Sequence, residues 1–106
     1  MPKTITITAI ASVSPLGNNP KVIWERYLTN EHCFVDKNFG SQNEFVAVLD
    51  ADSKNEIESL KQSDSKYKSL DNSVLFAIAA SRKAVENAGW EKGAVFGINI
   101  GSSRGA

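Results

Sequence analysis

Ala94-Val95-Phe96-Gly97-Ile98-Asn99-Ile100 is the most informative stretch of this chain, because it is apolar on both faces of an extended backbone. This pattern is typical of a central parallel strand that helices cover on both sides. A turn rich in glycine and serine, residues 101–106, follows it directly. A strand followed by such a turn normally leads into further structure. We therefore expect residues 94–100 to be an inner strand of an α/β layer.

A helix is predicted just before this strand, between Asp71 and Gly89. Asp71 is placed to cap its start, and several alanines raise its helix propensity. Gly89 fits the left-handed position just past the end, where Trp90 would pack against Val85 in a Schellman ending. Trp90 is thus expected to be structural. Apolar side chains mark one broad face of this helix: Val74, Leu75, Ile78, Val85 and Ala88.

Three further elements are predicted near the start of the chain. Residues 4–9 alternate threonine with apolar residues, which indicates a strand. Residues 14–17, Ser-Pro-Leu-Gly, fit a type I turn, because proline presets the φ angle of its second position. Asn19 can then cap a helix that begins at Pro20, where the missing N–H costs nothing.

The middle of the chain gives weaker signals. Residues 44–50 are short, apolar and bounded by polar residues, which indicates a strand. Ser53 and Glu56 match a capping box and predict a short helix that starts at Ser53. Residues 62–69 alternate in charge and are expected to form an exposed connection.

The predicted order is strand, helix, strand, short helix, helix, strand. This order favours an α/β fold with right-handed crossovers, in which helices pack on a mainly parallel sheet. The length of 106 residues suits one domain, and no internal linker or repeat interrupts residues 1–106.

Composition excludes several classes of function. Twelve basic and twelve acidic residues cancel, so we expect no binding to nucleic acid or to an anionic membrane. The longest apolar run, residues 74–80, is far shorter than the roughly 20 residues that span a bilayer. A single cysteine, Cys33, cannot form an internal disulfide, and no secretory signal is visible. A cytoplasmic location is therefore expected.

His32 and Cys33 are adjacent, as a base and a nucleophile would be. Adjacent residues point in different directions, and no third residue is placed to orient the histidine, so a structural thiol is favoured. One histidine and one cysteine also cannot supply the four ligands of a structural zinc site, so no metal is expected.

The turn at residues 101–105 follows a predicted strand, as a phosphate-binding loop would. It lacks the G-x-G-x-x-G spacing and any Gly-Lys-Ser/Thr step. A turn that packs on a neighbouring segment is favoured and no cofactor is expected, although a nucleotide-binding enzyme stays open as a third possibility.

Three segments, in order along the chain, together resemble the opening of a β-ketoacyl synthase, a condensing enzyme of fatty-acid and polyketide synthesis. Residues 5–17 are similar to its V-x-I-T-G-x-G-x-x-S-P-x-G segment. Residues 70–89 resemble its alanine-rich helix, which ends in Ala-Gly before a strand. Residues 96–106 resemble its strand and G-S-G-x-G-G turn. The resemblance implies a partial thiolase-like layered fold.

The chain departs from the family pattern at several positions. Ala9 and Ala11 stand where the family usually has glycine, and alanine resists positive φ. Arg104 replaces an often apolar residue, and by resemblance this position lies near the acyl-binding pocket. An arginine there would shorten or polarise the pocket of the parent enzyme. The alternative, that Arg104 points to solvent or to an acidic partner, is equally open.

The resemblance implies a reaction in which a cysteine takes an acyl group from acyl carrier protein or coenzyme A. A malonyl thioester then loses carbon dioxide, and a carbon–carbon bond forms. The cysteine and the two residues that stabilise negative charge lie, in the family, beyond the equivalent of Ala106. We therefore assign no catalytic residue, and we expect residues 1–106 to be the inactive amino-terminal part of a synthase N-terminal domain.

A chain with only the first strands of such a sheet would expose unpaired edges. Exposed edges and apolar faces promote association, so a homo-oligomer or association with a partner is expected. The rival interpretation is a small, non-catalytic α/β interaction module.

Overall fold

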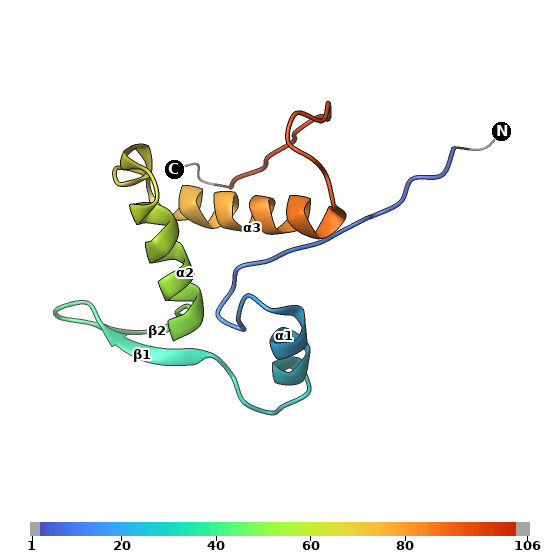
Figure 1. Cartoon of the computed structure of the whole chain (residues 1–106). Helices are drawn as coiled ribbons and strands as arrows, with labels where there is room; N and C mark the ends of the chain where they lie inside the picture. Colours follow the sequence, from blue (N-terminus) through green and yellow to red (C-terminus); the bar gives the residue numbers. More distant parts are fainter. Residues whose placement is uncertain (1–2, 104–106) are drawn as a thin grey trace.

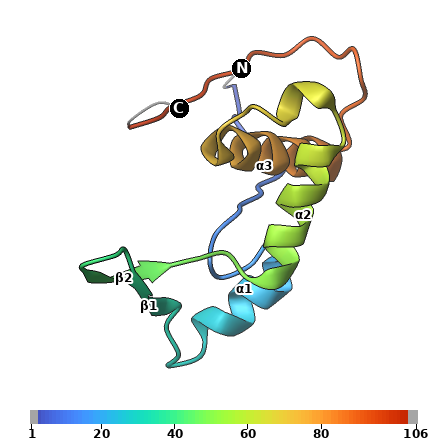
Figure 2. The same cartoon turned by 90° about the vertical axis from the view of Figure 1, so that its left-hand side faces the viewer.

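A computed structural model describes residues 3–103 of the chain (Figure 1). The elements run α1 (Pro20–Tyr27), β1 (Phe34–Asn38), β2 (Asn43–Ala47), α2 (Ala51–Gln62), the 3-10 helix η1 (Ser65–Tyr67) and α3 (Asn72–Ala88). Helices α2 and α3 lie at a steep angle to each other. The β1–β2 hairpin and α1 lie beside the start of α2, at the end away from α3 (Figures 1 and 2).

The turn and the helix near the start of the chain are confirmed. The Gly17 N–H donates to the Ser14 carbonyl at 2.9 Å, and Gly17 has a φ of 124°. Helix α1 begins at Pro20, and the Asn19 side chain accepts from the Lys21 N–H at 2.9 Å. The side-chain cap satisfies a free helix N–H, and proline fixes the φ of the first turn.

Both predicted ends of α3 are confirmed. The Asp71 side chain accepts from the Ser73 N–H at its start. At its end, Gly89 has a φ of 72° and donates to the Glu86 carbonyl at 3.0 Å, while the Trp90 N–H donates to the Val85 carbonyl at 3.2 Å. These two hydrogen bonds define a Schellman ending.

The predicted start of α2 at Ser53 is wrong. The helix begins at Ala51, and Asp50 is its cap, since one carboxylate oxygen accepts from the Ser53 N–H at 2.9 Å. Ser53 is therefore inside the first turn, where its side chain is buried. Glu56 does not reach back to the start of the helix but faces Lys83 of α3.

Residues 3–103 contain one sheet, the antiparallel pair β1–β2, with Phe34 opposite Ala47 and Asn38 opposite Asn43. The strand predicted at residues 44–50 is thus present in part, as Asn43–Ala47, while β1 was not predicted. Gly40, with a φ of 89°, turns the chain between the two strands.

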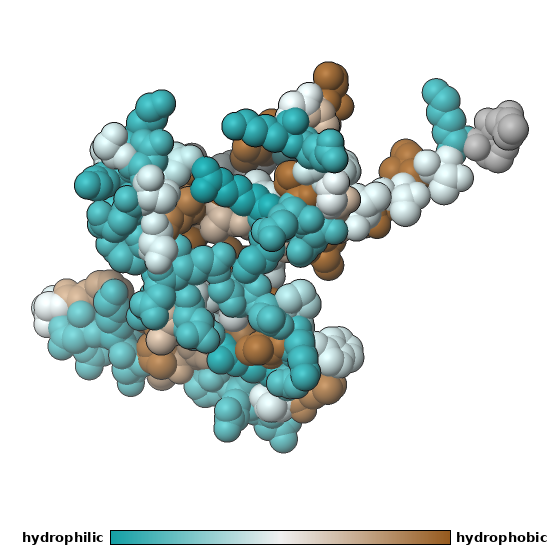
Figure 3. Space-filling view, viewed as in Figure 1, coloured by the Kyte–Doolittle hydropathy of each residue, from teal (hydrophilic) through white to brown (hydrophobic). Residues whose placement is uncertain are grey.

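The prediction of a mainly parallel sheet is wrong for residues 3–103. Neither residues 4–9 nor residues 94–100 form a strand, and Ile5 and Val95 are almost fully exposed. A β-ladder needs a neighbouring strand, and no backbone hydrogen bond joins residues 4–9 or 95–100 to another described segment. Figure 3 shows apolar side chains on the surface of the amino-terminal segment and of the segment after α3. The described fold is therefore mixed α/β, with helices predominating.

The core is small and lies between α2 and α3. Leu75 is fully buried, and Ile57 and Ala79 are nearly so. Six partly buried apolar residues pack around these three: Val13, Leu49, Leu60, Tyr67, Leu70 and Phe76. Because the core draws on the loop before α1 as well as on both helices, it fixes the turn at residues 14–17 relative to α2 and α3.

Candidate functional site

The turn at residues 14–17 is held by a single guanidinium group. Nη1 of Arg26, in the last turn of α1, donates to the Leu16 carbonyl at 2.8 Å and lies 3.4 Å from the Pro15 carbonyl. The same nitrogen lies 3.3 Å from Oδ2 of Asp50. One side chain thus connects the turn, α1 and the start of α2.

Asp50 joins two functions in one carboxylate. Oδ1 caps α2, and Oδ2 pairs with Arg26. The Ser53 hydroxyl and the Ser53 N–H hold the pKa of Asp50 below its usual 3.8. The N–H donates a hydrogen bond to the carboxylate, whereas the hydroxyl is outside hydrogen-bonding geometry. The Arg26 charge acts in the same direction, whereas partial burial opposes it. Asp50 is therefore ionised at neutral pH.

A second polar cluster ties the end of the turn to α2 and α3. Nζ of Lys83 donates to the Asn18 carbonyl at 3.1 Å and lies 3.4 Å from Oε1 of Glu56. The Asn18 amide donates to the other oxygen of Glu56. The Lys83 and Glu56 side chains are about one-third exposed, so solvent weakens their attraction. The cluster positions Asn18, just before α1.

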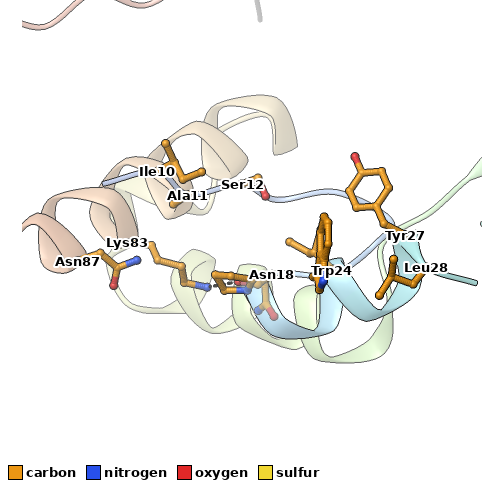
Figure 4. Close-up of a pocket in the computed structure, with 11 residues that line it drawn as sticks. Ile10, Ala11, Ser12, Asn18, Trp24, Tyr27, Leu28, Lys83 and Asn87 are labelled. Atoms are coloured by element: carbon orange, nitrogen blue, oxygen red, sulfur yellow. Dashed lines mark hydrogen bonds between the residues drawn. The ribbon is translucent and has the colours of Figure 1, made fainter. Parts of the chain in front are cut away.

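Beside this cluster lies an open hollow of about 510 Å³ (Figure 4). Trp24 and Tyr27 of α1 and Leu28, which follows it, form one end, and Lys83 and Asn87 of α3 lie at the other. The remaining lining residues come from α1 and from the segments that precede it: Ile10, Ala11, Ser12, Asn18, Pro20 and Ile23. Apolar side chains dominate, and no thiol, imidazole or carboxylate lines the hollow. It can bind an apolar group, and the charged group in its lining, Lys83, is paired with Glu56.

His32 and Cys33 do not form a reactive pair in the structure. Nδ1 of His32 accepts from the Phe34 N–H at 3.1 Å, and the two rings lie 5.8 Å apart. The Cys33 thiol is half-buried and free. The ring nitrogen that could accept a thiol proton is therefore occupied by a backbone N–H. Among residues 3–103, no group of three or more potential ligands could hold a metal ion.

Arg104, the candidate substrate-binding residue, lies outside the described residues, so its role stays a prediction. Ala9 and Ala11 are described, and no residue other than glycine between positions 3 and 103 has a positive φ. The loop at Ala9 and Ala11 therefore avoids the left-handed backbone that would strain an alanine.

The residues that organise this region were missed in the sequence. Arg26 lies in α1, Asp50 caps α2 and Lys83 lies in α3, and nothing in their spacing brings them together. Asp50 alone had a local signal, since an aspartate three residues before Ser53 is a good cap. The capping-box pattern at Ser53 and Glu56 obscured it.

The described part of the chain is thus a small α/β unit with a well-anchored turn and an apolar hollow. In residues 3–103, no helix is both long and apolar enough to cross a membrane. A scan against protein families matches the β-ketoacyl synthase N-terminal domain over residues 3–106. The chain belongs to this family. Comparisons with curated proteins and with solved structures returned no match.

Proposed function

We propose that this chain acts as the amino-terminal part of a 3-oxoacyl-[acyl carrier protein] synthase. The enzyme would condense an acyl thioester with a malonyl thioester, with loss of carbon dioxide, in fatty-acid or polyketide synthesis. The family match over residues 3–106 carries this proposal. Acyl carrier protein and coenzyme A thioesters are the substrates that the family implies, and the cytoplasm is the proposed location.

Within the enzyme, residues 1–106 would form one structural unit of the synthase N-terminal domain and would supply no reacting group. Two observations support this role. His32 and Cys33 are not arranged as a base and a nucleophile, and neither is among the residues that line the hollow beside α1. Exposed apolar side chains in residues 5–10 and 95–100 provide surfaces on which further strands of such a domain could pack.

Split-enzyme complementation tests this proposal. The 106-residue chain is co-expressed with a β-ketoacyl synthase from which the matching amino-terminal segment has been removed. Release of carbon dioxide from malonyl-acyl carrier protein and formation of the 3-oxoacyl product are then measured. We expect no activity from either part alone and measurable activity from the pair. Activity of the 106-residue chain alone, or none from the pair, would overturn the proposal.

A matched control addresses Cys33. The Cys33→Ser variant should complement as well as the unchanged chain, and intact-mass measurement after incubation with an acyl thioester should find no acyl group on Cys33. An acyl adduct that disappears in Cys33→Ser would show that this thiol is a nucleophile.

The second candidate function is a non-catalytic interaction module. It is favoured by the same exposed apolar segments, which would then contact a different protein. Failure of complementation, together with a stable folded chain, would favour this alternative.

A further inference from the structure

The hollow beside α1 is apolar at one end and polar at the other. Trp24, Tyr27 and Leu28 form the apolar end, and these side chains are between 65% and 70% exposed. Large apolar side chains that face water are stabilised by any apolar group that covers them. An aromatic ring suits this end, because the indole and phenol rings offer it faces and edges. The volume of about 510 Å³ lies within the range of small-molecule sites.

The polar end has hydrogen-bonding groups to spare. Lys83 and Asn87 are four positions apart on α3 and so share one face of the helix, and Figure 4 shows both at this end of the hollow. The Lys83 ammonium has three N–H donors, and two of them face the Asn18 carbonyl at 3.1 Å and the Glu56 carboxylate at 3.4 Å. The Asn87 side chain makes no hydrogen bond to another residue among positions 3–103. One donor of Lys83 and the whole Asn87 amide are therefore available to a ligand.

The charge at the polar end is already balanced. An anionic group beside Lys83 would be repelled by the Glu56 carboxylate, and a cationic group would be repelled by Lys83 itself. A neutral polar group avoids both costs. A primary amide fits best, because it can exchange two hydrogen bonds with the Asn87 amide, donating one and accepting the other.

We propose that this hollow binds a small neutral amphiphile, an aromatic ring joined by a short linker to a primary amide. The ring lies against Trp24, Tyr27 and Leu28. The amide pairs with Asn87, and its carbonyl oxygen also accepts from Lys83. This site takes no part in the thioester reaction proposed above, so its tests and the complementation test can fail independently of each other.

The first test compares two probes of equal size, 3-phenylpropanamide and 3-phenylpropanoate, which differ in charge. The Trp90→Phe variant leaves Trp24 as the single tryptophan, and its fluorescence is measured as each probe is added. We expect a saturable change, with the amide bound at least about threefold more tightly than the carboxylate. Equal affinities would overturn the proposal, as would the absence of saturable binding.

Glu56→Gln tests the charge argument in the same background. It leaves the Lys83 charge unbalanced, so the carboxylate should gain affinity and the advantage of the amide should disappear. Glu58→Gln is the matched control, because it removes the same charge from α2 at a residue that pairs with Gln62 instead of Lys83. This control should keep the preference for the amide. An unchanged preference in Glu56→Gln, or an equal loss in both variants, would contradict the proposal.

Asn87→Ala tests the contact with the amide. It should weaken binding of 3-phenylpropanamide by about threefold or more, since the paired hydrogen bonds are lost. Asn55→Ala, at an exposed asparagine of α2 that does not line the hollow, should leave binding unchanged. Circular dichroism verifies that α2 and α3 remain folded in each variant. Folded Asn87→Ala that binds the amide as tightly as the unchanged residue does would rule out this site.

Discussion

Arg26 and Asp50 lie 3.3 Å apart, from Nη1 to Oδ2, and together they join the end of α1 to the start of α2. The same guanidinium nitrogen donates to the Leu16 carbonyl, and the same carboxylate caps α2. The pair therefore fixes the turn at residues 14–17, which ends the first of the three segments that resemble β-ketoacyl synthases. Substitutions at Asp50 can separate its two contributions.

Asp50→Ala should lower the free energy of unfolding by about 1–2 kcal/mol, since it removes both the helix cap and the partner of Arg26. Asp50→Asn should cost less than about 1 kcal/mol, because asparagine caps a helix as well as aspartate does and only the partly exposed ion pair is lost. Urea unfolding followed by circular dichroism measures both. Asp52→Asn, in the exposed first turn of α2, is the control. Equal losses in the two Asp50 variants would show that the cap contributes little.

The stability that Asp50 contributes should depend on pH. Its folded pKa lies below the usual 3.8, so the contribution is fully present above that value and is lost as the pH falls through the folded pKa. The stability difference between the unchanged chain and Asp50→Asn should therefore be constant from about pH 5 to 7 and shrink in stronger acid. Urea unfolding at several pH values measures it, and a difference that grows in acid would contradict the sign of the shift.

Gly17→Ala should destabilise the fold by about 1–3 kcal/mol, because alanine is strained at a φ of 124°. A methyl group there would lie 3.5 Å from Cγ1 of Val22 and 3.6 Å from Oδ2 of Asp50, which are ordinary contacts, so the cost is in the backbone. Gly101→Ala is the control, since Gly101 has no positive φ and open space around it, and it should change stability by less than about 0.5 kcal/mol. Thermal unfolding of the two variants makes the comparison.

Leu75→Ala should cost about 2–5 kcal/mol, because it opens a cavity at the fully buried centre of the core. Leu28→Ala removes the same atoms from a side chain that is 70% exposed and should cost less than about 0.5 kcal/mol. Urea unfolding followed by circular dichroism tests both. Similar losses for the two variants would place the effective core at α1 instead of between α2 and α3.

The helix ends were largely predictable from sequence, because a cap is a local interaction. Asn19, Asp71 and Gly89 each act on backbone groups within a few residues, so their types and positions carry the information. Strand pairing was not predictable in this way, although part of the strand expected at residues 44–50 is present as β2. The apolar patterns at residues 4–9 and 94–100 are those of strands, but a strand forms only where a second one pairs with it, and pattern alone does not supply that partner.

In the candidate site, too, local contacts were predictable from sequence and long-range contacts were not. The turn at residues 14–17 was predicted because proline and glycine set its backbone directly. The contacts of Arg26 and Lys83 were not, because each side chain reaches across the molecule to residues at least ten positions away. Tertiary packing brings these groups together, of α1 on the turn for Arg26 and of α3 on α2 for Lys83.

Both tryptophans are partly exposed, which decides what the fluorescence of this protein can report. Trp24 borders the hollow beside α1 and is 65% exposed, and Trp90 follows α3 and is 47% exposed. Both indoles already contact water in the folded state, so the wavelength of their fluorescence emission should change little on unfolding. Trp90, in contact with the Phe96 ring, should respond instead to events in the segment after α3. Tryptophan fluorescence of this protein therefore reports on its surface and not on its core.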